Sequence, residues 1–245
     1  MQNAELAARL FDLDELAKKQ GRIMCTGFLS PAEQAQLAPL AKKLSGELSF
    51  EAGYDGAERA LAVITPQKYF GEKALPISYL EIHIHGDEEI SHRDIMGAVL
   101  ALGIKRELLG DIITSIAPPV IVVGEKMADY IILNLDKIGR AGVDIIRTDV
   151  APTPPEPKFE EIHASVASLR LDSVVSEGFK ISRNDAAEFI KKAAVAVNFE
   201  EQTSPSKTVK VGDKISLRGK GKILLCEQGG LSRKGRTFIT IRKYI

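Results

Sequence analysis

The chain has 245 residues, 44% hydrophobic and 27% charged, which is ordinary for a soluble globular protein and sufficient for two or three small domains. Its formal charge of zero hides a split: residues 1–161 carry 17 Lys and Arg against 25 Asp and Glu, or −8, whereas residues 162–245 carry 16 against 8, or +8. No apolar run reaches the roughly 18 residues of a membrane span, the acidic first segment does not resemble a secretory signal, and two unpatterned cysteines favour a cytoplasmic location and no zinc ribbon.

Residues 1–75 alternate between helical and extended patterns and predict a small α/β domain. Ser30 followed by Pro31 is typical of a helix start, and Asp55-Gly56 between apolar runs is typical of a hairpin turn. The expected elements are a helix over 4–20, a strand over 22–29, a helix over 30–44 and a hairpin over 46–65.

Residues 76–150 predict a βαββαβ order, the split pattern of ferredoxin-like and RRM-like domains. The segment "ISYLEIHIH" alternates apolar and polar residues, as a half-buried strand does. Ser91 and Asp94 have the spacing of a capping box at the start of the helix that follows. The other expected elements are strands over 109–116, 119–124 and 142–150 and a helix over 125–135.

The segment 151–161, "APTPPEPKFEE", is expected to be an extended linker because its prolines exclude a helix interior or a central strand. The basic residues 162–245 then predict a C-terminal domain in which two short helices lead into a small sheet. The first helix, "LRLDSVVSEG", is expected to expose both Arg170 and Asp172, and the second to begin at Ser182. Together the helices are expected to gather basic residues on one outer surface: Arg170, Lys180, Arg183, Lys191 and Lys192.

This C-terminal segment resembles the S4 RNA-binding domain. The shared pattern is Arg-Leu-Asp, then Ser-Arg, Ala-x-x-Ile, Val-x-Val-Asn and Gly-Asp-x-Ile, in order over about sixty residues. The chain departs from it at Ala193-Ala194, where many members have a glycine. The resemblance implies that the helical pair and the following loop grip structured RNA. The implied contacts are Arg170, Lys180, Ser182, Arg183, Lys191, Lys192, Asn198 and Lys207.

Two further basic runs have glycines that would let backbone approach phosphate. "LRGKGK" offers Arg218, Lys220 and Lys222, and "LSRKGR" offers Arg233, Lys234 and Arg236. Solvated basic hairpins are the alternative for both runs. We expect phosphate contacts, because the basic charge is clustered in this part of the chain.

Together, "SHRDIMGAVLALGIKRELLGDI", "ADYIILNLDKIGRAGV" and the S4-like segment make the chain similar to the YlmH family of bacterial three-domain proteins. The resemblance implies an α+β protein with an N-terminal α/β domain (1–75), an RRM-like domain (76–150), a linker (151–161) and an S4 domain (162–245). It also implies a non-catalytic, monomeric, cytoplasmic protein without a cofactor. Its partners would be the ribosome, large-subunit rRNA and peptidyl-tRNA, in the rescue of stalled ribosomes and C-terminal tailing of the nascent chain. Within the RRM-like domain, Arg93 and Arg106 are added as candidate RNA contacts.

Two alternatives stay open: an RNA-modifying enzyme that uses S4 for targeting, and an interaction protein of the cell-division machinery. Against the first, the chain lacks the synthetase signatures and the Gly-x-Gly-x-Gly of a methyltransferase. A pseudouridine synthase would need a catalytic domain, usually after S4, and here S4 is last.

The segment "IHIHGDEEISHRD" holds three of the four histidines and looks at first like a metal site. His83 and His85 share one strand face, but His92 lies seven residues further on, at a helix start, and no cysteine is near. We therefore expect no metal. Glu81, His83 and His85 should instead lie on the open sheet face, where an RRM places base-stacking aromatics.

Overall fold

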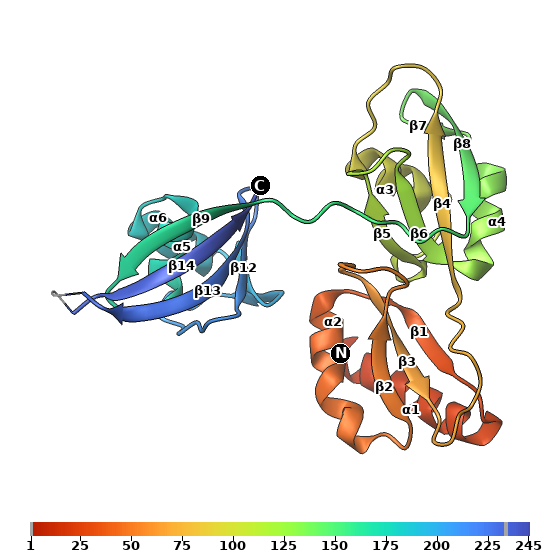
Figure 1. The fold of residues 1–245 in the computed structure, drawn as a ribbon, viewed down its shortest axis with the longest axis horizontal. Helices are drawn as coiled ribbons and strands as arrows, with labels where there is room; N and C mark the ends of the chain where they lie inside the picture. The colour runs from red at the N-terminus through yellow and green to blue at the C-terminus, as the bar shows by residue number, and fades with distance from the viewer. Residues whose placement is uncertain (1, 233–234) are drawn as a thin grey trace. The chain divides into compact units, whose positions relative to one another are not determined.

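A computed structural model describes residues 2–232 and 235–245 and has an α+β fold. The chain divides into two compact units between Pro155 and Glu156, inside the proline-rich segment (Figure 1). Among the helices of these described ranges, none is long and apolar enough to cross a membrane.

The first unit begins with a three-stranded antiparallel sheet in the order β1-β3-β2, with helices on one face. The hairpin around Asp55-Gly56 is confirmed, with Gly56 at φ +83°. The helix expected over 30–44 instead becomes a 3-10 helix at Ala38. Pro39 explains this change, because proline has no N–H to donate and its ring clashes with the preceding turn. The elements are α1 Gln2–Gln20, β1 Met24–Leu29, α2 Pro31–Leu37, η1 Ala38–Lys43, β2 Glu47–Glu51 and β3 Ala60–Thr65.

The middle of the chain has the predicted βαββαβ order. Its strands form one antiparallel sheet in the order β5-β6-β4-β8, the ferredoxin-like arrangement, extended at the edge by β7. The capping box of Ser91 and Asp94 is present at the start of α3. The elements are β4 Ile77–Ile84, α3 His92–Ala101, η2 Arg106–Leu108, β5 Leu109–Ile113, β6 Val120–Gly124, α4 Glu125–Asn134, β7 Lys137–Ile138 and β8 Ala141–Thr148.

The two sheets of this unit pack against each other. Phe28 and Val63 of the first sheet form one buried cluster with Ile113 and Val122 of the second, while α3 and α4 cover the second sheet's opposite face. The prediction that Glu81, His83 and His85 lie on the open sheet face is confirmed, whereas the start of the same strand is covered by the first sheet. Tyr79 of β4 lies in the cluster and donates its hydroxyl to the Gly53 carbonyl at 2.6 Å.

Polar side chains also join the two sheets of this unit, and we call this group, Tyr54, Glu58, Arg59 and Asp111, the sheet–sheet seam. The Asp111 carboxylate of β5 accepts hydrogen bonds from the Tyr54 hydroxyl at 2.7 Å and from the Glu58 backbone at 2.8 Å. The Arg59 guanidinium donates to backbone carbonyls of Phe28, Leu109 and Arg106. Because burial and these bonds hold the residues in place, the N-terminal and middle sheets form one body.

The second unit is a six-stranded antiparallel sheet in the order β11-β10-β12-β13-β14-β9, with α5 and α6 on one face. The expected linker ends at Lys158 rather than residue 161, because Ile162, Ala164 and Val166 direct β9 toward the core. The elements are β9 Phe159–Val166, α5 Leu171–Phe179, α6 Arg183–Lys191, β10 Val195–Val197, β11 Glu200–Gln202, β12 Lys214–Leu217, β13 Gly221–Leu231 and β14 Thr237–Tyr244.

Candidate nucleic-acid interface

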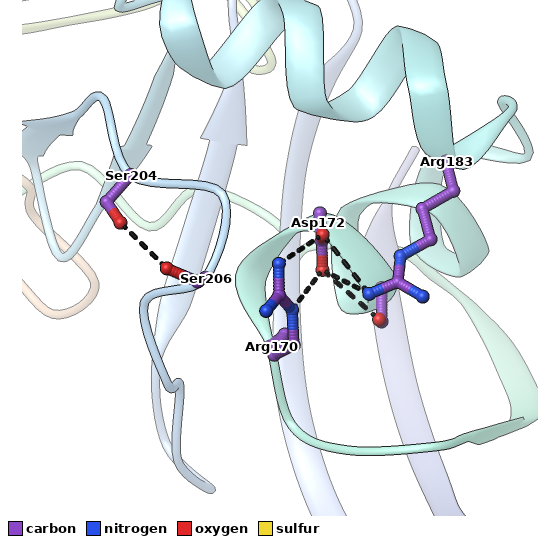
Figure 2. Close-up of polar contacts among 6 residues, drawn as sticks. Arg170, Asp172, Arg183, Ser204 and Ser206 are labelled. Carbon is purple, nitrogen blue, oxygen red and sulfur yellow. Dashed lines mark hydrogen bonds and ion pairs between the residues drawn. The ribbon is translucent and has the colours of Figure 1, made fainter.

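One buried carboxylate organises the start of the two helices in the second unit. Asp172, in the first turn of α5, is 4% exposed. It accepts two hydrogen bonds from Arg170, at 2.9 and 3.2 Å, and two from the Arg183 guanidinium, both at 3.2 Å (Figure 2). The expectation that Asp172 is exposed is wrong, because the carboxylate turns inward to pair with both arginines. The arginine side chains remain 39% and 53% exposed.

The charge state of this cluster follows from its contacts. Burial alone raises the pKa of Asp172, but the hydrogen bonds and positive charges of Arg170 and Arg183 outweigh it, so its pKa lies below the ordinary 3.8. The carboxylate is therefore ionised at neutral pH and holds two guanidinium groups side by side. Each guanidinium has five N–H donors, so donors remain for phosphate oxygens.

The loop over residues 203–207 closes the start of α5. Backbone N–H groups of Leu171 and Asp172 donate to the carbonyls of Lys207 and Pro205, at 2.8 and 3.0 Å. Ser204 and Ser206 of this loop are also drawn in Figure 2, with their hydroxyl oxygens 3.1 Å apart. These two helix N–H groups are thus already satisfied and are not available to another acceptor.

The lysines expected beside the arginines are more widely spread. Lys180 ends α5 in a left-handed conformation, and its ammonium contacts Glu160 of β9 at 2.6 Å. Lys191 lies in the last turn of α6 and Lys192 caps its end, so both are at the opposite end of that helix from Arg183. Ser182 caps α6 by accepting from the Asp185 backbone at 3.0 Å. Only Arg170 and Arg183 among these are joined by a common partner in the described residues.

Asn198 has a structural role in the turn region. Its amide donates to Asp213 at 2.8 Å and its side-chain oxygen accepts from the Lys214 backbone at 2.9 Å. Ala193, in the Ala193-Ala194 pair where the sequence departs from the S4 pattern, has φ +51°. A non-glycine residue is strained in that conformation.

The remaining basic candidates lie in several places. Arg218 contacts Glu201 at 3.2 Å, Lys220 is exposed in the turn between β12 and β13, and Lys222 lies over the Tyr244 ring at 5.5 Å. Arg236 donates to Ser165 of β9, whereas Arg233 and Lys234 lie outside the described residues.

The candidates in the first unit differ in kind. Arg93 is exposed at the start of α3. The half-buried Arg106 guanidinium donates instead to the carbonyls of Leu109 and Gly110, at 2.9 and 3.1 Å, which is a structural use of the side chain.

The histidines are held as separate pairs. His83 contacts Glu81 at 3.0 Å and His85 contacts Asp144 at 2.7 Å, while His92 is exposed. In the part of the chain that the structure describes, no three His, Cys, Asp or Glu side chains form a group that could hold a metal ion.

Comparison with known proteins agrees with this architecture. Residues 73–151 match the family described as "Putative RNA-binding domain in YlmH", and residues 169–215 match the S4 domain. Ribosome-associated protein quality control protein P2 of Bacillus subtilis (strain 168) is 29% identical over 235 residues, which cover 93% of this chain and 90% of that protein. The solved structure of cell division protein ylmH from Streptococcus pneumoniae has a similar fold. It is 23% identical, with a TM-score of 0.51, and the likeness covers 60% of this chain and 92% of that chain. A YlmH-type RNA-binding domain followed by an S4 domain, together with similarity over nearly the whole length of the Bacillus protein, supports the YlmH family for this chain.

Proposed function

We propose that this protein is a non-catalytic factor that binds structured rRNA of the large ribosomal subunit through exposed basic residues along α5 and α6, with the arginine pair at their start as the main contact. The observation that carries the proposal is the pair of half-exposed guanidinium groups on Asp172. Guanidinium groups match phosphate geometry with paired donors, and structured RNA is recognised largely through its backbone and shape. The excess of basic residues in 162–245 favours the same partner.

A relative supports the ribosome as the partner, because the similar Bacillus protein is named for ribosome-associated quality control. In the proposed role the S4 unit docks on rRNA in the cytoplasm, and the first unit reaches peptidyl-tRNA held on the obstructed subunit. Binding energy would favour the ribosomal state that supports C-terminal tailing of the nascent chain. The fixed packing of the N-terminal and middle sheets supports this positioning role, because one body can transmit a defined orientation.

Co-sedimentation with purified large subunits tests the proposal. Replacing Arg183 and Lys191 with Glu should abolish co-sedimentation, since each substitution reverses a charge on the proposed interface. Reversing Lys42 and Lys43, two exposed residues of η1, makes the same charge change elsewhere and should leave it intact. Lys191→Glu alone, at an exposed site, should weaken binding without affecting the fold. Equal co-sedimentation of all variants would refute the proposed interface.

A role in cell division is the competing proposal, since the streptococcal protein carries that name. Pull-downs with and without RNase separate the two. Loss of ribosomal partners after RNase supports the RNA role, and partners that survive RNase favour a protein-interaction role.

A further inference from the structure

The second unit has another surface, on the side of its sheet away from α5 and α6. Ile239 and Ile241 of β14 face the helices and are buried, so Phe238, Thr240, Arg242 and Tyr244 face the other way. The registered partners of these four residues on β9 are Ser165, His163, Glu161 and Phe159. We call these eight residues the aromatic sheet face.

Exposed aromatic rings distinguish this face. Phe238 is 51% exposed and Phe159 is 39% exposed. The Phe159 and Tyr244 rings meet edge to face with centroids 4.8 Å apart, and the Arg242 guanidinium lies 5.8 Å from the Phe159 centroid. Aromatic rings beside cations on an open antiparallel sheet form the kind of platform on which unpaired bases stack while their phosphates meet the cations.

A hollow adjoins the Phe238 ring. It is an open depression of about 360 Å³, and its lining includes His163, Glu227, Phe238 and Thr240. A base could stack its flat face on the Phe238 ring. The imidazole of His163, the carboxylate of Glu227 and the hydroxyl of Thr240 could then hydrogen-bond to the edge of that base. Gly229 also lines the hollow. A Cβ at this position would lie 3.3 Å from the Cβ of Phe238, so a side chain here would crowd Phe238.

Three cations lie on or beside the face, Arg242, Lys222 and Arg236, against the two carboxylates Glu161 and Glu227. Arg242 and Lys222 lie over its rings, and Arg236 is bonded to Ser165 at its end. Of the carboxylates, Glu161 is already shared between His163 and Arg242, at 3.5 and 3.8 Å. The corresponding face of the RRM-like sheet is partly covered by the N-terminal sheet and is less available for stacking.

We propose that the aromatic sheet face binds unpaired bases of single-stranded RNA, with Phe238 as the main stacking residue. This inference rests on the proposed RNA-binding function and adds to it a second surface, separate from the arginine cluster at α5 and α6. The protein would then hold a structured RNA element on its helices and a neighbouring single-stranded segment on its sheet.

Fluorescence anisotropy of the full-length protein with a labelled oligouridine of about ten nucleotides tests the inference, because single-strand-binding OB-folds cover about 4–16 nucleotides. Phe238→Ala should weaken binding between about fivefold and 150-fold, the measured range for loss of one base–aromatic stack. Phe238→Tyr should retain binding, because it keeps the ring. Phe70→Ala is the matched control, since Phe70 is 93% exposed in the other unit, and it should have no effect.

Salt dependence identifies the mechanism. Phe238→Ala should leave the slope of affinity against salt unchanged, whereas Arg242→Gln should reduce it by about one phosphate contact. Equal affinity of wild type and Phe238→Ala, or no oligouridine binding by wild type, would overturn the inference. Large-subunit co-sedimentation of the Arg183 and Lys191 double variant is scored separately, so failure of the helical interface is distinguishable from failure of the sheet face.

Discussion

Replacing Asp172 with Asn tests the buried carboxylate at the centre of the candidate interface. The substitution keeps the shape of the side chain but removes the charge that both Arg170 and Arg183 contact. One amide oxygen can still accept, but the amide NH₂ would face guanidinium donors and find no acceptor there. The second unit should therefore lose stability, and the two arginines should lose their fixed orientation.

The magnitude follows from the geometry. A hydrogen bond to a charged group contributes about 1.5–3 kcal/mol, and removing one partner of a fully buried pair costs about 3–5 kcal/mol. Here the arginines are half-exposed and can turn to water, so the loss should be near 2 kcal/mol. For a unit of this size, about 1 kcal/mol shifts Tm by roughly 4–8 °C, so the shift should be about 8–16 °C.

Calorimetry of the full-length protein measures the shift, with hydrogen exchange of α5 and α6 peptides assigning the transition to the second unit. Glu188→Gln is the matched control, because it also removes one carboxylate in this unit but from an exposed pair with Lys192. Its cost should stay below about 0.5 kcal/mol. If Asp172→Asn melts at the same temperature as Glu188→Gln, the carboxylate does not organise the site and the reasoning is refuted.

Three further predictions concern strain, the seam and pH. Ala193→Gly should raise the free energy of unfolding by about 1 kcal/mol, because Ala193 has φ +51°. Ala187→Gly inside α6 is the control and should lower the free energy of unfolding by a similar amount; the Tm values of the two variants test both predictions. Asp111→Ala removes the acceptor of three hydrogen-bond donors at the sheet–sheet seam. It should therefore speed amide hydrogen exchange in the loop that joins β2 to β3, and unchanged protection of these amides would contradict the role of the seam. The folded-state pKa of Asp172 lies below 3.8, so its stabilisation is present above about pH 4 and is lost as pH falls through that lower pKa. Melts of Asp172→Asn should therefore fall less steeply with acid than those of wild type.

Sequence patterns located the elements whose signals are local. The capping box of Ser91 and Asp94, the alternation along β4 and the turn at Asp55-Gly56 each depend on a few neighbouring residues, and all three are present. The sheet–sheet contact is long-range, so periodicity alone did not reveal it. One signal was available: β3 and β6 are continuous apolar runs, which are typical of strands covered on both faces.

The candidate site was predicted only in part, for a similar reason. The motif identified Arg170 and Arg183, but the inward turn of Asp172 depends on packing that spacing does not specify. The partners of Lys180 and Asn198 come from β9 and from the turn before β12, which are distant in sequence. The aromatic sheet face depends on the register of β9 with β14, which are distant in sequence, and part of β9 lies in the segment predicted to be linker, so local patterns do not indicate it.

Crosslinking of the protein to RNA in cells, followed by sequencing of the bound RNA, tests the central claim most directly. We expect large-subunit rRNA to dominate the crosslinked reads from wild type, and those reads to disappear when Arg183 and Lys191 are both replaced by Glu. Reads spread over unrelated RNAs, or rRNA reads that persist in the double variant, would contradict the account.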